Sequence, residues 1–313
     1  MKRITATAQD EGARLDHVLE RLAPDMGLRG RRRFCELGLV LVNGRPAAAA
    51  RKVREGDSIE LQDEQAPQNA QALPGADAPR LVARTAAFAF LYKPAAMHTE
   101  SLAGKPGESL QDVVESLAGG KARLLNRLDF ATSGLAAAAL NRAGEEAYHS
   151  AQDRGLTEKR YLALLEGALT RPVLADRRLL LKNRSRVLVE LDRHPDVRRH
   201  TRITPLAVMP AAPLWEKLGL TCPAKGPEQL TLAGCVILKG ARHQIRAHCA
   251  SCGFPLAGDA RYGAQSRAAG DTERFFLHHG RLILPEAEAL CLPPWLDELG
   301  EDAAYRARRW LEA

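Results

Sequence analysis

The chain has 313 residues, with 45 Lys and Arg against 38 Asp and Glu, a formal net charge of +7 and a pI near 9.2. This length accommodates two domains with separate hydrophobic cores, and an excess of arginine is typical of proteins that contact phosphate groups. The sequence has no apolar run long enough to cross a bilayer, no signal peptide and only six irregularly spaced cysteines, so we expect a soluble, cytoplasmic protein without a disulfide framework.

The first predicted unit covers residues 1–62 and combines two short helices with a small hairpin sheet. RLDHVLERL places leucine and valine at helical spacing, and GRRRFCELG predicts a second helix that ends at Gly38. An apolar strand then leads into an Asn43-Gly44 turn, and VREGDSIEL ends in an alternating strand. A basic cluster at the start of the second helix fits either a solvated face or a phosphate-binding surface. Its members are Arg29, Arg31, Arg32 and Arg33.

This N-terminal segment resembles the S4 domain, a small RNA-binding module, over RLDHVLERL and GRRRFCELGLVLVNGRPAAAARKVREGDSIEL. The resemblance implies that the basic helix and the adjoining loops lie on RNA phosphates, which provides affinity and orientation rather than base specificity. Residues 63–79 contain no Lys, Arg or aromatic residue and show no apolar periodicity. They predict a flexible linker between this module and the rest of the chain.

The second predicted unit covers residues 80–313. LVARTAAFAFLYKP predicts one strand that ends at Lys93 and Pro94, ESLQDVVESL a short helix, and EKRYLALLEG a strand that ends at Gly167. Residues 171–202 are dense in arginine and poor in aromatics, which suits an RNA duplex surface, although the same arginines could protect a sheet edge. Residues 208–229 predict a surface insertion, and the chain closes with a polar tail.

Several kinds of active site are excluded by missing motifs. The chain has no G-x-x-x-x-G-K-[ST] loop, no G-x-G-x-x-G after a strand and no G-x-S-x-G elbow, which argues against NTPases, dinucleotide enzymes and serine hydrolases. His243 and His248 are five residues apart and would not share a metal, and the Cys249/Cys252 pair has no second pair, so we expect no metal site. Arg246 lies in a moderately apolar segment and therefore requires a carboxylate or phosphate partner.

Four segments in order resemble the RluA-type RNA pseudouridine synthases: YKPAAMHTES from Tyr92, NRLDFATSGL at 126–135, EKRYLALLEG at 158–167 and GARHQIRAHCASCGFPLAGDARYG at 240–263. The resemblance implies an α+β fold in which a central mixed, largely antiparallel sheet is flanked by helices and loops, beside the small S4-like α+β domain. It also implies cofactor-free isomerisation of specific uridines in structured RNA, ribosomal more than transfer RNA, by a monomer without an obligate protein partner.

The resemblance also implies roles for individual residues. Taken alone, Asp129 could be a turn or capping residue. As a family member it aligns with the catalytic aspartate, either the nucleophile or the base that starts glycosidic cleavage. Arg246 would pair with this aspartate and keep it ionised, Tyr161 would stack on the flipped base and assist removal of the C5 proton, and Arg127 would insert where the uridine leaves the stack. Further predicted substrate or RNA contacts are Lys93, Pro94, Asn126 and Ile245.

The chain departs from the family pattern at one position, and at another the family pattern conflicts with helix propensity. The family usually has His where this chain has Asn126, which concerns RNA contact or target choice more than catalysis. Alanine propensity favours one helix through residues 134–151, whereas the family has a strand through 134–140 and a helix after it; we expect the family arrangement.

Two other functions compete with this interpretation. A catalytically inactive RNA-binding or ribosome-assembly protein on the same fold would have lost Asp129, Tyr161 or Arg246, and all three are present. An S4-bearing RNA enzyme with different chemistry, such as a methyltransferase, would need a nucleotide-type cofactor loop, which the sequence lacks.

Overall fold

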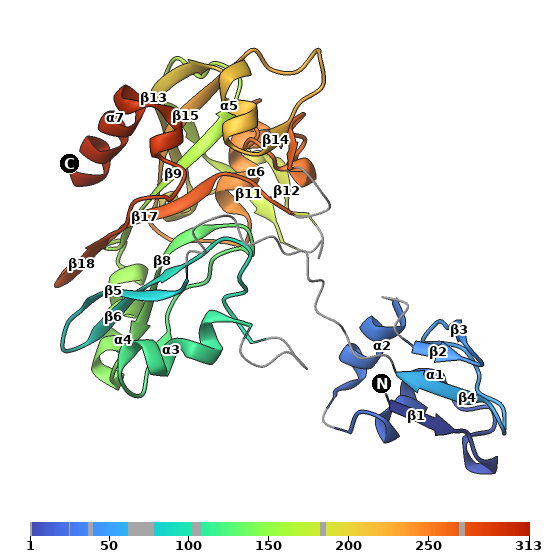
Figure 1. Ribbon diagram of the computed structural model, residues 1–313. Helices are drawn as coiled ribbons and strands as arrows, with labels where there is room; N and C mark the ends of the chain where they lie inside the picture. Colours follow the sequence, from blue (N-terminus) through green and yellow to red (C-terminus); the bar gives the residue numbers. More distant parts are fainter. Residues whose placement is uncertain are drawn as a thin grey trace. The chain divides into compact units, whose positions relative to one another are not determined.

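The computed structural model describes residues 2–24, 26–36, 40–61, 78–101, 108–181, 186–268 and 273–313, and the chain divides into two compact units (Figure 1). One unit contains the described residues of 2–61 together with Ser101 and Glu108, and the other contains the described residues of 78–100 and 109–313. The predicted helix end at Gly38 and most of the predicted linker, residues 63–77, lie outside the described residues.

The first unit is a four-stranded antiparallel sheet, ordered β1-β4-β2-β3, packed with short helices around a single core. Leu15, Val18, Leu19 and Leu22 are buried, which confirms the predicted apolar face, although the helix changes from α to 3-10 geometry after Val18. The predicted Asn43-Gly44 turn is present, with positive φ at both residues, as a type I′ turn requires. The elements are β1 (Lys2–Thr5), η1 (Ala8–Asp10), α1 (Leu15–Val18), η2 (Leu19–Arg21), α2 (Leu28–Glu36), β2 (Val40–Val42), β3 (Arg45–Pro46) and β4 (Ser58–Leu61).

The second unit is built on a ten-stranded sheet whose main path is β10-β13-β15-β9-β17-β8-β6-β5, with β18 paired to β17 and β7 paired to β8. Among the described strands of this sheet, β17 and β8 are the one pair that runs parallel, which confirms a mixed, largely antiparallel sheet. The strands are β5 (Arg80–Arg84), β6 (Phe88–Lys93), β7 (Arg123–Leu124), β8 (Ser133–Ala139), β9 (Glu158–Glu166), β10 (Val173–Ala175), β13 (Thr201–Pro210), β15 (Gln229–Ile237), β17 (Leu277–Leu284) and β18 (Ala287–Leu290). Two separate strand pairs are β11 (Arg177–Leu180) with β12 (Leu188–Arg193) and β14 (Leu220–Thr221) with β16 (Arg267–Ala268).

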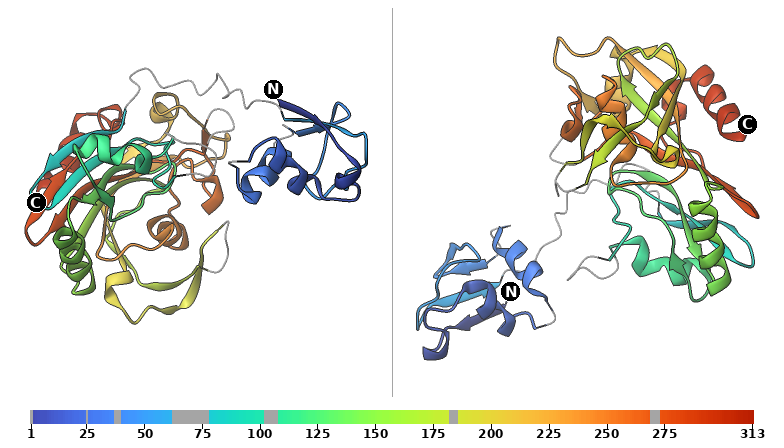
Figure 2. Two further views of the ribbon diagram at one scale, coloured as in Figure 1. Left: turned by 90° about the horizontal axis from the view of Figure 1, so that it is seen from below. Right: turned by 180° about the vertical axis from the view of Figure 1, so that it is seen from behind.

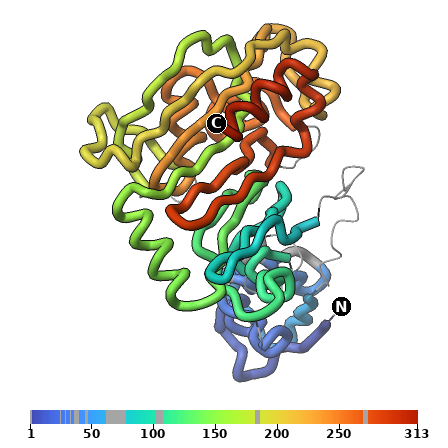
Figure 3. The backbone as a smooth tube through the Cα atoms, turned by 90° about the vertical axis from the view of Figure 1, so that its left-hand side faces the viewer, coloured from blue at the N-terminus to red at the C-terminus, as the bar shows by residue number. Residues whose placement is uncertain are grey.

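Helices cover both faces of this sheet, so its central strands are buried on both sides. Along β9, Ala163 and Leu165 join a core cluster with residues of α6, whereas Leu162 and Leu164 join a second cluster with residues of α5 and α7, as the alternation of a strand requires. The β11–β12 hairpin packs beside α6 (Figure 2), and the C-terminal helix α7 packs on β13 and β15 (Figure 3). The helical elements are α3 (Leu110–Ala118), α4 (Arg142–Asp153), η3 (Val197–Arg199), α5 (Ala212–Lys217), α6 (Gln244–Ser251), η4 (Ala260–Tyr262), η5 (Asp297–Leu299) and α7 (Glu301–Glu312).

The choice between strand and helix after the 126–135 motif is settled in favour of the strand. β8 and α4 follow one another as the family arrangement predicts, because β8 pairs with β6 on one side and with β17 on the other. Gly134 allows this close approach: its φ is 111°, and an added Cβ would lie 2.4 Å from the carbonyl oxygen of His279. Asn141 then begins α4, its side chain accepting a hydrogen bond from the Gly144 N–H at 2.9 Å.

Two predictions about the second unit are wrong. Residues 81–94 form two strands rather than one, because the Thr85 hydroxyl accepts hydrogen bonds from the N–H groups of Ala87 and Phe88 and makes a turn. The polar tail is the amphipathic helix α7, whose small apolar side chains pack inward. In the predicted insertion, residues 208–229, Leu214 and Leu218 of α5 are buried in the core. Within the described residues, no helix has the length and apolar character needed to cross a membrane.

Candidate active site

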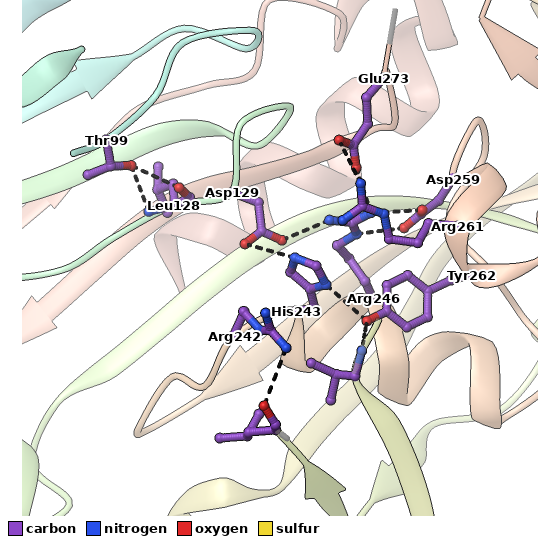
Figure 4. A network of polar contacts seen from close by, with 12 residues as sticks. Thr99, Leu128, Asp129, Arg242, His243, Arg246, Asp259, Arg261, Tyr262 and Glu273 are labelled. Carbon is purple, nitrogen blue, oxygen red and sulfur yellow. Dashed lines mark hydrogen bonds and ion pairs between the residues drawn. The ribbon is translucent and has the colours of Figure 1, made fainter. Parts of the chain in front are cut away.

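Asp129 lies on the loop between β7 and β8, and the backbone on both sides of it is held by hydrogen bonds. Thr99 Oγ1 donates to the Leu128 carbonyl at 2.8 Å and accepts the Leu128 N–H at 3.1 Å (Figure 4). The N–H of Thr132 donates to the Asp129 carbonyl at 3.0 Å. The carboxylate itself is 23% exposed, so a rigid loop presents a partly accessible acid.

Arg246, on α6, is 1% exposed and contacts three carboxylates (Figure 4). Its Nη1 donates to Asp129 Oδ2 at 3.1 Å, and its Nε and Nη2 donate to the two oxygens of the buried Asp259 at 2.7 and 2.9 Å. Nη2 also donates to Glu273 Oε1 at 3.0 Å, and the guanidinium carbon lies 4.1 Å from the centre of the Phe275 ring. The bidentate pair with Asp259 orients the guanidinium plane so that Nη1 faces Asp129.

The charge of this buried arginine is secured by its partners. Burial alone would lower the pKa of Arg246, but the hydrogen bonds from its guanidinium to Asp259, together with the charges of Asp259 and Asp129, raise that pKa above its ordinary value. The side chain is therefore a permanent cation in a nearly dry environment, where its attraction for the Asp129 carboxylate is little screened by water.

His243 approaches the other oxygen of Asp129, and Tyr262 contacts His243 from the opposite side of the ring. His243 Nε2 is 3.9 Å from Asp129 Oδ1, and His243 Nδ1 is 3.0 Å from the Tyr262 hydroxyl (Figure 4). That hydroxyl also accepts the Val187 N–H at 2.8 Å. Burial lowers the pKa of His243, partly opposed by the Asp129 charge, so the imidazole favours its neutral form. His248 is bonded elsewhere, to Thr201 Oγ1 and the Arg177 carbonyl, so the two imidazoles do not share a ligand position.

Tyr161, on β9, belongs to the same buried cluster as Leu128 and Ile245, and it is 6% exposed. Its ring stacks on His279, with centroids 4.4 Å apart and planes 12° apart. Burial raises the pKa of Tyr161 well above its usual range, so its hydroxyl keeps its proton. The tyrosine is thus a neutral, largely buried ring with one face against His279, in the same core cluster as Leu128 of the loop that carries Asp129.

The remaining residues predicted to contact substrate divide into internal and exposed groups. Lys93 is fully buried, and its ammonium donates to the carbonyls of Pro94, Met97 and Phe130 at 2.8, 2.8 and 3.3 Å. Burial lowers its pKa to about 7, and the charge of Asp129 opposes this shift. Its contacts indicate support of the loop that carries Asp129 rather than a place on the pocket wall.

Asn126 also has an internal role, whereas Arg127 is exposed. The Asn126 side chain accepts the Ala137 N–H at 2.7 Å and donates to the Leu135 carbonyl at 3.4 Å, so it binds the backbone of β8. Ile245 is buried in the core. Arg127 is 69% exposed and pairs with Glu100 at 3.0 Å.

In the first unit, the basic cluster is partly internal. Arg31 is 8% exposed and pairs with Glu20 at 2.8 Å, which makes it a structural residue. Arg32 pairs with the buried Asp16 at 2.7 Å, and 45% of its side chain remains exposed. Hydrogen bonds from Arg14 and Arg32 outweigh burial and lower the pKa of Asp16, which stays anionic. The side chains of Arg29 and Arg33 lie outside the described part of the chain.

Four residues of the site were not predicted from the sequence: Asp259, Glu273, His243 and Tyr262. The requirement of Arg246 for a carboxylate partner was a signal for Asp259, which follows it by 13 residues. Nothing comparable pointed to Glu273.

Comparisons with known proteins support one family. The family model for RNA pseudouridylate synthase matches residues 87–251, more than half of the chain, and this segment includes Asp129, Tyr161 and Arg246. The chain is 29% identical over 147 residues to an uncharacterized RNA pseudouridine synthase of Bacillus subtilis, covering 47% of this chain and 46% of the relative. It is 27% identical over 288 residues to ribosomal large subunit pseudouridine synthase C of Rickettsia bellii, covering 87% of this chain and 89% of that protein.

The solved structure of human RNA pseudouridylate synthase domain containing 1 has a TM-score of 0.56 and 22% identity, covering 75% of this chain and 95% of that one. At this identity the likeness shows the fold alone. The chain spans only part of several relatives: 46% of the Bacillus subtilis protein and 60% of the bovine and human proteins named RNA pseudouridylate synthase domain-containing protein 1.

Proposed function

Because the chain belongs to the RNA pseudouridylate synthase family, we propose that it isomerises uridine to pseudouridine within structured RNA. The observation that supports this most is the pair formed by Asp129 on its fixed loop and the buried Arg246, 3.1 Å apart. The intact pair disfavours the alternative of an inactive RNA-binding protein. We further propose ribosomal RNA as the substrate, in keeping with the name of the Rickettsia bellii relative, ribosomal large subunit pseudouridine synthase C.

The reaction rearranges atoms already present in the substrate. The bond between N1 and C1′ breaks, the uracil turns, C5 bonds to C1′, the C5 proton leaves and N1 gains a proton. Asp129 would act as the nucleophile at C1′ or as the base that starts the cleavage. Its Oδ2 accepts a hydrogen bond from Arg246, whereas among the described residues the polar group nearest Oδ1 is the imidazole at 3.9 Å, so Oδ1 is the oxygen we assign to the reaction.

Tyr161 and Arg127 would handle the flipped nucleotide. Because the Tyr161 hydroxyl stays protonated, we assign the ring to stacking on the base and not to proton abstraction as a phenolate. The exposed guanidinium of Arg127, two residues before Asp129, is suited to occupy the space that the uridine leaves in the RNA stack.

We also propose that the first unit is an S4-like module that docks the enzyme on RNA. Its two short helical segments, its four-stranded sheet and the exposed Arg32 support this role. Contacts of this kind would act on phosphates and leave target choice to the second unit.

Tritium release from RNA labelled at uridine C5 tests the activity. We expect release by the wild type from ribosomal RNA transcripts, none by Asp129→Asn, and full release by the control Asp302→Asn, which changes an exposed carboxylate of α7. No release by the wild type from any cellular RNA, or equal release by wild type and Asp129→Asn, would show the proposal to be wrong.

A further inference from the structure

A chain of polar contacts leads from the β11–β12 hairpin to the reactive oxygen of Asp129. The Val187 N–H donates to the Tyr262 hydroxyl at 2.8 Å, that hydroxyl lies 3.0 Å from His243 Nδ1, and His243 Nε2 lies 3.9 Å from Asp129 Oδ1 (Figure 4). Val187 is the residue immediately before β12. The series of contacts therefore links the β11–β12 hairpin, the segment 243–262 and the loop that carries Asp129.

The donors and acceptors along this series of contacts favour one position for the imidazole proton. A backbone N–H can only donate, so the Tyr262 oxygen accepts from Val187, and the single phenolic proton is free to donate to His243 Nδ1. A neutral imidazole that accepts at Nδ1 carries its proton on Nε2. With the tyrosine as donor, and with the Asp129 carboxylate as the group that faces Nε2, this tautomer directs an N–H toward Oδ1.

The backbone of His243 is held in an unusual conformation to make this arrangement. His243 has φ 54° and ψ 19°, a left-handed conformation that is unfavourable for a residue with a Cβ. The next residue fixes the turn: the Gln244 side chain accepts the Ala241 N–H at 3.0 Å and donates to the Arg199 carbonyl at 2.9 Å. The imidazole is thus placed between Tyr262 and Asp129 by the local fold.

The hairpin end of the chain is also well anchored. Val187 and Tyr262 share a small core cluster with Ala247 of α6, against which Leu179 and Val189 of the hairpin pack. The guanidinium carbon of Arg186 lies 5.2 Å from the centre of the Tyr262 ring. Tyr262 is therefore the point where the arginine-rich hairpin meets the site.

We propose that Tyr262 and His243 are positioning residues that connect the β11–β12 hairpin to Asp129 and direct an Nε2–H toward Oδ1; this inference rests on the proposed function. Arg246 orients Oδ2, and His243 orients the second oxygen without occupying it. When RNA contacts the hairpin, a shift of Val187 would thereby change the position of His243 relative to the Asp129 carboxylate.

Two variants and one control test the proposed positioning role of Tyr262 and His243. Tyr262→Phe removes the donor to Nδ1. His243→Asn keeps a residue that tolerates the left-handed conformation but removes the donor to Asp129. Tyr148→Phe is the control, since it removes the hydroxyl of another buried tyrosine, 3.4 Å from Gln152 and outside the contact network of Asp129. The measurements are nitrogen NMR of ¹⁵N-histidine-labelled full-length protein, single-turnover rates of pseudouridine formation and RNA dissociation constants.

We expect His243 to be the Nε2–H tautomer in the wild type and to lose this preference in Tyr262→Phe. Both site variants should lower the single-turnover rate about tenfold with the RNA dissociation constant changed less than about threefold, while the control matches the wild type. An Nδ1–H tautomer in the wild type, or rates within about twofold of the wild type in both site variants, would overturn the proposal. The NMR measurement of the tautomer needs no turnover, so it tests the contact between Tyr262 and His243 even if the wild type forms no pseudouridine.

Discussion

Replacing Asp259 with asparagine removes the charge that holds the buried side of Arg246. The amide retains one acceptor oxygen but places an NH₂ donor against the guanidinium, so at least one of the two bonds, at 2.7 and 2.9 Å, is lost. Removing one partner of a buried ion pair costs about 3 to 5 kcal/mol of unfolding free energy. Because Asp129 and Glu273 remain as partners, we expect the lower value, about 3 kcal/mol, or a fall in Tm of roughly 6 to 12 °C.

Tryptophan fluorescence during urea unfolding measures this loss in the second unit alone, because Trp215, Trp295 and Trp310 all lie there. Glu273→Gln is the matched control: its carboxylate contacts the same arginine but is 35% exposed, so its removal should cost less than about 1 kcal/mol. If Asp259→Asn destabilises the protein no more than Glu273→Gln does, Asp259 is not the main support of Arg246.

Three further predictions concern buried and exposed charges. Burial lowers the pKa of Lys93 to about 7 in the folded protein, below its value in the unfolded chain, so its ammonium opposes folding and this cost declines as pH rises above 7. In urea unfolding, the free energy of unfolding of the wild type should therefore rise by up to about 2 kcal/mol between pH 7 and pH 9, relative to the Lys93→Met variant. Tyr161→Phe should leave the alkaline absorbance titration of the folded protein unchanged, because burial raises the pKa of Tyr161 above the pH range of the titration. A reduced amplitude would contradict a protonated Tyr161, and Tyr305→Phe, at an exposed position, shows the amplitude that one titrating tyrosine contributes. Arg32→Ala should reduce the salt dependence of RNA binding by about one phosphate contact, whereas Arg31→Ala should lower the stability of the first unit. Equal salt slopes for the wild type and Arg32→Ala would argue against phosphate contact by Arg32.

The sequence motifs predicted the fold and the central ion pair because both depend on short segments in a fixed order. The strand at β8 is an instructive case. Its alanines favour a helix, but pairing on both sides outweighs that intrinsic preference. The predicted α+β architecture with a mixed sheet is confirmed, and the structure brings Arg246 to Asp129.

The partners of these residues could not be read from the sequence, because they depend on tertiary packing. Asp259 lies in a segment rich in turn residues, and Tyr262 contacts His243 through its hydroxyl at the end of a 3-10 turn. Lys93 stands at a strand end, where exposure is common, yet three carbonyls enclose its ammonium. Likewise Arg31 looks like its neighbour Arg32 in sequence, but in the fold Arg31 is buried against Glu20, whereas Arg32 pairs with Asp16 and stays partly exposed.

The sequence separation within the site has a consequence for synthesis of the protein. Arg246 and Asp129 are 117 residues apart, and Ser133 and His278, which join β8 to β17 through a 2.8 Å hydrogen bond, are 145 apart. A nascent chain has all the strands of the first unit once Leu61 has emerged, but it cannot close the central sheet before β17 is translated. The segment proposed to bind RNA is thus available to fold well before Arg246 can reach Asp129, and the proposed function therefore implies that an emerging chain contacts RNA before it can modify it.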